Sequence, residues 1–138
     1  MGRIVAIDYG KKRTGIAVSD PMKMIAGGLS TVLSHKVIPY LKDYLKEQDV
    51  ELFILGEPRQ LNYEPSENML RVHVFREKLL KAIPSVEIKM LDERFTSVMA
   101  HQAMIQGGLK KAKRQNKELV DELSATILLQ GYLESIRK

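Results

Sequence analysis

The 138-residue sequence contains no cysteine and no tryptophan, and aromatic residues make up 6% of it. Without cysteine the chain can form neither disulfides nor thiolate metal sites, so a bound metal would need oxygen or histidine ligands. The same absence suits the reducing cytosol, and we expect a cytoplasmic protein. The scarcity of aromatic side chains argues against sequence-specific reading of single-stranded nucleic acid, which relies on base stacking.

Long apolar runs and the apolar segment of a signal peptide are also missing, so we expect no membrane partner. Positive charge is in excess: 22 Lys and Arg against 17 Asp and Glu give a net charge of +5. A basic chain favours a polyanionic partner such as nucleic acid. The length predicts one domain over residues 1–138 that buries its own core.

The hydrophobic pattern predicts alternating elements in the order βββαβαβαα, without a long linker or repeat. Strands are expected at about 3–8, 14–19, 25–33, 52–55 and 86–90, the last with one exposed face at or near a sheet edge. Helices are expected at about 34–48, with Ser34 as N-cap, and at 67–82, 97–105 and 118–136. Helix-linked strands are parallel and the initial meander is antiparallel, so we expect an α/β fold with a mixed sheet flanked by helices.

The first strand ends on a carboxylate followed by a cationic turn. Four apolar residues, Ile4–Ile7, precede Asp8 and Gly10, and Lys11, Lys12 and Arg13 follow. A carboxylate at the end of a buried strand can hold a divalent metal, while the neighbouring cations can meet phosphate oxygens. The alternative is that Asp8 and Gly10 only shape a turn.

A second acidic pair, Asp92 and Glu93, follows the fifth strand and precedes Arg94. If the first and fifth strands are parallel, their carboxylates reach the same rim of the sheet, where ligands bind in open α/β folds. Arg94 could then contact phosphate or neutralise the two acids. The alternative is that both acids are solvated first-turn residues favoured by the dipole of the following helix.

The last predicted helix carries an aspartate on an otherwise small and apolar stripe. Asp121 shares a helix face with Ser124, Ala125 and Leu128. An aspartate pressed against a sheet is costly unless it is paired or binds a metal. Its neighbour Glu122 is expected to face solvent.

A basic loop at 107–117 precedes that helix, and two glycines open it. Its cations are Lys110, Lys111, Lys113, Arg114 and Lys117. Such a loop beside an acidic rim suits a nucleic-acid backbone, with affinity that falls as salt rises. The alternative is an ordinary solvated run of charge.

Together these residues resemble the YqgF/RuvX family, the bacterial pre-16S rRNA nucleases formerly described as Holliday-junction-resolvase-like proteins. The resemblance covers essentially the whole chain, in order and at compatible spacing. The motifs that carry it are Asp8-Tyr9-Gly10, Thr14-Gly15-Ile16-Ala17-Val18, Gly56-x-Pro58, Asp92-Glu93-Arg94, Gly107-Gly108 and Asp121-x-x-Ser124-Ala125.

The resemblance implies an RNase H-like fold with sheet order 3-2-1-4-5 and hydrolysis of phosphodiester bonds at the 5′ end of the small-subunit rRNA precursor. The catalytic acids that it implies are Asp8, Glu93 and Asp121. Two Mg²⁺ or Mn²⁺ ions about 4 Å apart would activate a water and stabilise the leaving oxygen. Asp8 would bridge the metals, Lys11, Lys12 and Arg13 would steady the backbone, and the partner would be precursor rRNA or a pre-ribosomal particle. Monomer and homodimer both remain open.

The chain departs from the family after the fourth strand, where Gly56-Glu57-Pro58 replaces the usual Gly-Leu-Pro. Pro58 favours an extended Glu57, which could reach the rim as an additional metal ligand or remain a solvent-facing loop acid. Asp92 is a weaker candidate ligand than Glu93. Two other functions stay open: a Holliday-junction-type DNA resolvase or DNA nuclease with the same acids, and a non-catalytic nucleic-acid-binding domain.

Overall fold

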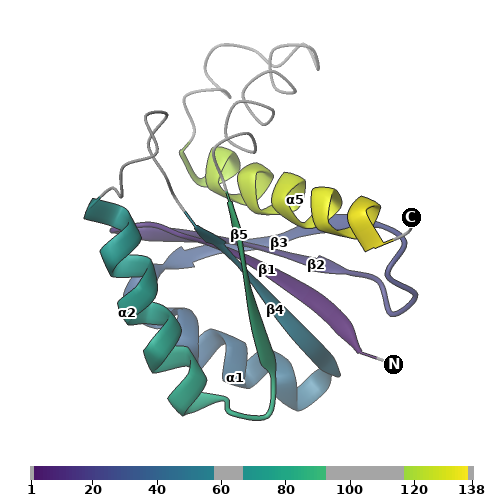
Figure 1. Ribbon diagram of the computed structural model, residues 1–138, viewed down its shortest axis with the longest axis horizontal. Coiled ribbons are helices and arrows are strands. Elements are labelled where there is room, and N and C mark those ends of the chain that lie inside the picture. Colours follow the sequence, from purple (N-terminus) through teal and green to yellow (C-terminus); the bar gives the residue numbers. More distant parts are fainter. Residues whose placement is uncertain (1, 58–66, 93–116, 137–138) are drawn as a thin grey trace.

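Five strands form one mixed sheet in the order β3-β2-β1-β4-β5, which confirms the order implied by the family resemblance. The computed structural model describes residues 2–57, 67–92 and 117–136 (Figure 1). The strands are β1 (Arg3–Tyr9), β2 (Arg13–Ser19), β3 (Ala26–Leu33), β4 (Val50–Glu57) and β5 (Glu87–Asp92). β4 is longer than its apolar run because it pairs with β1 at its start and with β5 up to its end.

The strand directions divide the sheet into an antiparallel and a parallel part. β1 pairs antiparallel with β2 and β2 with β3, whereas β1, β4 and β5 are parallel. The predicted mixed sheet is therefore confirmed, and β5 is an edge strand as its alternating pattern indicated. Because parallel strands end on the same side of a sheet, the carboxyl ends of β1, β4 and β5 form one rim.

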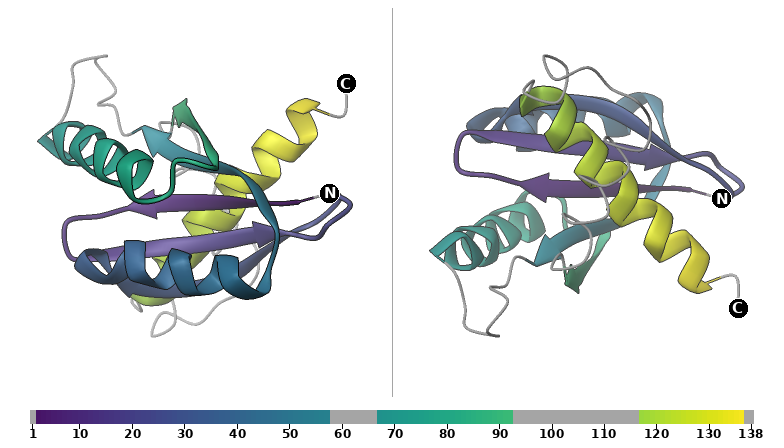
Figure 2. Two further views of the ribbon diagram at one scale, coloured as in Figure 1. Left: turned by 90° about the horizontal axis from the view of Figure 1, so that it is seen from below. Right: turned by 90° about the horizontal axis from the view of Figure 1, so that it is seen from above.

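Helices cover both faces of the sheet (Figures 1 and 2). α1 (Val37–Glu47) and α2 (Glu67–Ala82) lie on one face, and α5 (Lys117–Ile136) runs diagonally across the other. The bounds of α2 are the predicted ones, and α5 begins at the last residue of the predicted basic loop. The helix expected at 97–105 and the rest of that loop lie outside the described residues. None of the helices described is long and apolar enough to cross a membrane.

Alternate residues of β1 point into two separate apolar cores. Val5 and Ile7 are buried on the side of α1 and α2. Ile4 and Ala6 are buried on the side of α5, in the cluster that includes Leu129. Because side chains alternate between the faces of a strand, even-numbered residues of β1 face α5 and odd-numbered ones face α1 and α2.

Small residues allow α5 to lie close to the sheet. Ala125 and the paired Ala6 and Ala17 are fully buried in one cluster. Glu122 lies over Gly28 of β3, where a Cβ would collide with the glutamate side chain. The expectation that Glu122 faces solvent was wrong, because a glycine leaves room for this side chain against the sheet.

The expected N-cap role of Ser34 was also wrong. The chain enters α1 through a 3₁₀ turn, η1 (Ser34–Lys36), and α1 has no side-chain N-cap. Ser34 is 7% exposed, and its hydroxyl donates to the Gly10 carbonyl at 2.6 Å. The serine hydroxyl is thus used by a tertiary contact rather than by the first turn of the helix.

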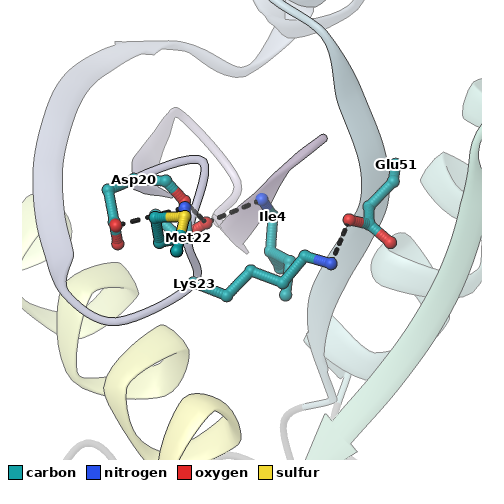
Figure 3. A network of polar contacts seen from close by, with 6 residues as sticks. Ile4, Asp20, Met22, Lys23 and Glu51 are labelled. Atoms are coloured by element: carbon teal, nitrogen blue, oxygen red, sulfur yellow. Dashed lines mark hydrogen bonds and ion pairs between the residues drawn. The ribbon is translucent and has the colours of Figure 1, made fainter. Parts of the chain in front are cut away.

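The connection between β2 and β3 is held by polar contacts to its own backbone and to β4 (Figure 3). The Asp20 carboxylate accepts hydrogen bonds from three backbone N–H groups, those of Met22, Met24 and Ile25. Lys23 forms an ion pair with Glu51 of β4. This contact joins the connection to the amino end of β4, at the far side of the sheet from the rim.

Candidate active site at the rim of the sheet

Asp8 lies near the carboxyl end of β1, the central strand, on the rim that the sequence predicted. Every second residue of a strand points to the same face, so the side chain of Asp8 is on the face of Ile4 and Ala6, which α5 covers. The residue is half-buried. Among the described residues, none hydrogen-bonds to the Asp8 carboxylate or forms an ion pair with it.

Glycines flank Asp8 on both neighbouring strands. Gly15 of β2 is its antiparallel partner. On the other side Ile7 pairs with Leu55, so the next step of the same register brings Asp8 beside Gly56. Because neither glycine carries a side chain, no side chain projects from the sheet at these two positions, and this leaves room for a bound group beside the carboxylate.

The Asp8 environment favours binding of a cation. A half-buried carboxylate has lost part of its hydration, and that loss is costly unless an opposite charge or hydrogen-bond donors replace the water. The described part of the chain supplies neither. Oxygen ligands are those that Mg²⁺ and Mn²⁺ prefer, so the chemistry of Asp8 fits such an ion.

The other expected acids lie at or beyond the limits of the described chain. Asp121 is in α5, one turn before the buried Ser124 and Ala125, so the stripe predicted from sequence faces the sheet from Ser124 onward. The side chains of Asp121 and Asp92, and all of Glu93 and Arg94, lie outside the description. Within the residues that are described, no three His, Asp or Glu side chains are grouped closely enough to hold a metal.

Glu57 lies on the opposite face of the sheet from Asp8. Glu57 shares a face of β4 with Phe53 and Leu55, which are buried on the side of α1 and α2. Its carboxylate Oε2 is 3.9 Å from Nε2 of His73 in α2, and its side chain is 17% exposed. Position 92 pairs in register with Glu57. The sequence could not predict which face of the sheet Glu57 occupies, because β4 is apolar on both faces and shows no alternation of polar and apolar residues.

The cationic turn between β1 and β2 is exposed at the rim. Lys11 and Lys12 are solvent-exposed, and Arg13, the first residue of β2, is half-buried. The remaining predicted cations are in the segment before α5 or, for Lys117, have no described side chain. Of the basic groups expected at the site, the structure therefore describes the side chains of these three, which follow Asp8 in the chain at the start of β2 and the turn before it.

Two buried hydroxyls that sequence reasoning missed hold this turn in place. The Oγ atoms of Thr14 and Ser34 are 2.8 Å apart, and the Ser34 N–H donates to the Lys12 carbonyl at 2.9 Å. The Ser34 hydroxyl donates its single hydrogen to the Gly10 carbonyl, so the Thr14 hydroxyl is the donor in the hydrogen bond between the two side chains. Only the buried polar character of residue 14, inside a strand, could have signalled this network.

The sequence is similar to one protein family over nearly its entire length. The family model described as "RuvX: Holliday junction resolvase" matches residues 2–135. A protein of Azobacteroides pseudotrichonymphae named "Putative pre-16S rRNA nuclease" is 63% identical over 138 residues, the whole of both chains. A protein of the same name from Parabacteroides distasonis is 58% identical over 98% of this chain and 96% of its own.

Solved structures share the fold at low sequence identity. The RuvC of Thermus thermophilus, in complex with a Holliday junction substrate, superposes with a TM-score of 0.58 at 18% identity, over 99% of this chain and 96% of that one. The Fowlpox virus resolvase, in complex with Holliday junction DNA, gives a TM-score of 0.59 at 15% identity, over 99% of both chains. The expected RNase H-like fold is therefore confirmed.

Proposed function

The chain belongs to the RuvX family, and from this membership we propose that it is a nuclease that hydrolyses phosphodiester bonds in the 5′-end maturation of pre-16S rRNA. The full-length relatives that carry the name pre-16S rRNA nuclease support this substrate. The observation that carries the proposal is Asp8: a half-buried carboxylate without a protein partner among the described residues, at the rim end of the central strand and between two glycines. We propose a cytoplasmic enzyme formed by one domain.

We propose that the activity depends on Mg²⁺ or Mn²⁺, with Asp8, Glu93 and Asp121 as ligands and catalytic acids. When bound, a pair of such ions supplies an activated water and stabilises the leaving oxygen. Asp8 contributes a carboxylate that is fixed by the central strand and already stripped of part of its water. This ligand set is supported by the chain order: position 93 directly follows β5, which is on the parallel side of the sheet with β1, and position 121 is in α5, one turn before the buried Ser124 and Ala125.

Glu57 is not part of the proposed ligand set. Its carboxylate faces α2, near His73, on the side of the sheet opposite Asp8. Asp92 of β5 is the register partner of Glu57 in the parallel pair, and it remains a weaker candidate ligand than Glu93. A Glu57→Gln variant that lost metal affinity would return Glu57 to the set.

The exposed cations beside Asp8 are proposed to bind the RNA backbone. Lys11 and Lys12 follow Asp8 within four residues, in a turn that Ser34 fixes. Their ammonium groups are available to phosphate oxygens and so would position the scissile strand across the rim. Arg13, Arg94 and the cations at 110, 111, 113, 114 and 117 are proposed to extend this basic surface.

A DNA-junction resolvase is the second candidate, because the matching family model is described as a Holliday junction resolvase. A resolvase must cut two strands symmetrically and would act as a homodimer, whereas an rRNA nuclease can act as a monomer. A monomer in solution would therefore argue against the resolvase.

The test is cleavage of a labelled precursor fragment that spans the 5′ end of the small-subunit rRNA, with Mn²⁺, Mg²⁺ or EDTA, and with a four-way DNA junction as competitor. Asp8→Asn should lower the RNA cleavage rate by roughly a hundredfold or more, because it removes a carboxylate that would hold the proposed metal ions. Asp49→Asn, an exposed residue at the other end of the sheet, is the charge-matched control.

Unchanged thermal unfolding of Asp8→Asn would show that the loss is chemical. RNA cleavage by Asp8→Asn at the wild-type rate would overturn the proposed site. Cleavage of the junction alone would assign the activity to DNA.

A further inference from the structure

A cavity of about 540 Å³ opens at the rim on the face opposite Asp8. It lies between the β1–β2 turn, the start of α1 and the middle of α2, and we call it the α1–α2 cavity. Figure 2 (left) shows β1 running between α1 and α2 on this face, with the β1–β2 turn beside the start of α1. Its volume is within the ~300–1,000 Å³ of typical ligand sites.

The lining of the α1–α2 cavity is cationic. Lys11 and Lys12 reach it from the turn, His35 from η1 and Lys78 from α2. None of the described residues that line it is acidic. No ion pair within the described chain engages the three lysine ammonium groups, so their charge is available to a ligand. An anion is therefore the expected occupant.

The same cavity has an apolar part. Tyr9 and Phe75 stack in its wall with ring centroids 4.3 Å apart and an angle of 19° between the rings. Leu33 is 47% exposed at its edge. A smaller cavity of about 260 Å³ shares Tyr9, Phe75 and Lys78 with it. Cations beside a flat apolar wall suit a ligand that combines a negative charge with an aromatic ring, and a nucleotide has both.

The position of the cavity connects it to the proposed cutting site. Tyr9 directly follows Asp8 in β1, and the two side chains point to opposite faces of the sheet. The turn that carries Lys11 and Lys12 joins the two faces at the rim. A strand that crosses this turn therefore reaches Asp8 on one side and the cavity on the other.

We propose that the α1–α2 cavity binds an unpaired nucleotide of the substrate strand next to the cut, with Lys78 and His35 contacting its flanking phosphate and the Tyr9–Phe75 wall contacting its base. The inference rests on the proposed nuclease function and adds a second contact surface to it. The nucleotide must be unpaired, because a base inside a duplex stays stacked and cannot enter a cavity. The binding discriminates little between bases, since every base has an apolar face.

The experiment measures binding of a labelled single-stranded RNA of about 12 nucleotides by fluorescence anisotropy, in EDTA to prevent cleavage and over a range of salt. Lys78→Gln should weaken binding several-fold and reduce the slope of log K against log salt by about 0.7, the value for one phosphate contact on a single strand. Lys81→Gln, the same change one turn further along α2 and outside the cavity, should bind like the wild type.

Photocrosslinking with 4-thiouridine in the same RNA provides a second readout. Crosslinks to peptides that contain residues 9–12 and 74–78 support the proposal. Equal affinities of Lys78→Gln and Lys81→Gln, with metal-dependent cleavage intact, would overturn this inference and leave the nuclease function standing. Absence of RNA binding by the wild type in EDTA would also overturn this inference, whereas only the loss of metal-dependent cleavage bears on the nuclease function. Competition by polyglutamate as strong as by RNA would indicate an acidic protein ligand instead.

Discussion

Ser34 is the residue on which the local geometry of the rim depends. Its backbone N–H and hydroxyl contact the carbonyl groups of Lys12 and Gly10, and its oxygen accepts the hydroxyl of Thr14. Gly10 itself is required at this point, because a Cβ there would collide with the Arg13 carbonyl oxygen. One buried hydroxyl thereby fixes the turn that carries Lys11 and Lys12.

Ser34→Ala is expected to lower the free energy of unfolding by about 1–3 kcal/mol, because the Gly10 carbonyl and the Thr14 hydroxyl lose a buried partner. Urea unfolding followed by circular dichroism measures the change. Ser85→Ala replaces an exposed serine and should stay within about 0.5 kcal/mol of the wild type. If the two variants were equally stable, the network would contribute nothing to folding.

Asp8 and Glu57 are two rim carboxylates in different surroundings. Both carboxylates are at the rim ends of neighbouring parallel strands, yet the pleat directs them to opposite faces. Glu57 lies near His73, whereas Asp8 has no partner among the residues described. Glu57 is one position further along its strand than Gly56, the neighbour of Asp8, and this offset of one residue gives the two acids different surroundings.

At the scale of elements, the β2–β3 connection is shaped by one carboxylate. Asp20 accepts the N–H groups of Met24 at 2.7 Å and Ile25 at 2.8 Å. The backbone hydrogen bond from Ile25 is the largest contribution that holds the pKa of Asp20 below its ordinary value. Lys23 adopts a φ of 59° within this connection and forms an ion pair with Glu51. The hydrogen bond that the Lys23 side chain donates to the Glu51 carboxylate lowers the pKa of Glu51.

The lowered pKa of Asp20 predicts a loss of stability in acid. In the unfolded chain the carboxyl has a pKa of about 3.9, so its stabilising contribution is complete above that pH. The contribution is lost as the pH falls through the lower pKa of the folded state. The melting temperature of Asp20→Asn should therefore fall less than that of the wild type between about pH 5 and pH 2.

Thermal unfolding at a series of pH values measures this difference. Asp49→Asn, whose carboxylate is exposed and accepts none of these backbone bonds, should follow the wild-type acid limb. Parallel curves for wild type and Asp20→Asn would show that the backbone bonds do not favour the ionised carboxylate.

At the scale of the whole molecule, one sheet joins two apolar cores. The α1–α2 side is centred on residues such as Phe53, and the α5 side on residues such as Leu129, both fully buried. β1 and β4 supply alternate residues to both cores. Neither core can therefore lose its packing without disturbing the strands that form the other.

Phe53→Ala should cost about 3–5 kcal/mol and Leu129→Ala about 2–5 kcal/mol of unfolding free energy, through lost burial and the cavity left behind. Because the cores share their strands, each variant should still unfold in a single transition. Far-ultraviolet circular dichroism and tyrosine fluorescence, measured on the same denaturant series, should give coincident midpoints. Separate midpoints in Leu129→Ala would show that α5 and its core unfold on their own.

The α1–α2 cavity is also a property of the whole molecule. Its basic side chains come from the β1–β2 turn, η1 and α2, which are separated by more than twenty residues at each step. No local pattern predicts that Lys12, His35 and Lys78 line one cavity, since each is an exposed polar residue in its own segment. The predicted involvement of Lys11 and Lys12 came from their nearness to Asp8 alone.

The sequence by itself determined the order of the elements that the structure describes, the bounds of α2, the edge position of β5 and the place of Asp8 at the end of a buried strand. These follow from local patterns: the spacing of apolar residues sets the type of element, and a carboxylate that follows an apolar run lies where the strand leaves the core. The roles of Glu93, Asp121 and the basic loop at 107–117 remain predictions from the family resemblance.

Only the tertiary structure decided which faces of the sheet Asp8 and Glu57 occupy. Strands buried on both sides carry no alternation, so the opposite facing of Asp8 and Glu57 depends on how β1 and β4 are placed between α5 and α2. The use of Ser34 at the turn and of Glu122 against Gly28 has the same origin. Such contacts join residues far apart in sequence, and their energies enter only when the layers pack together.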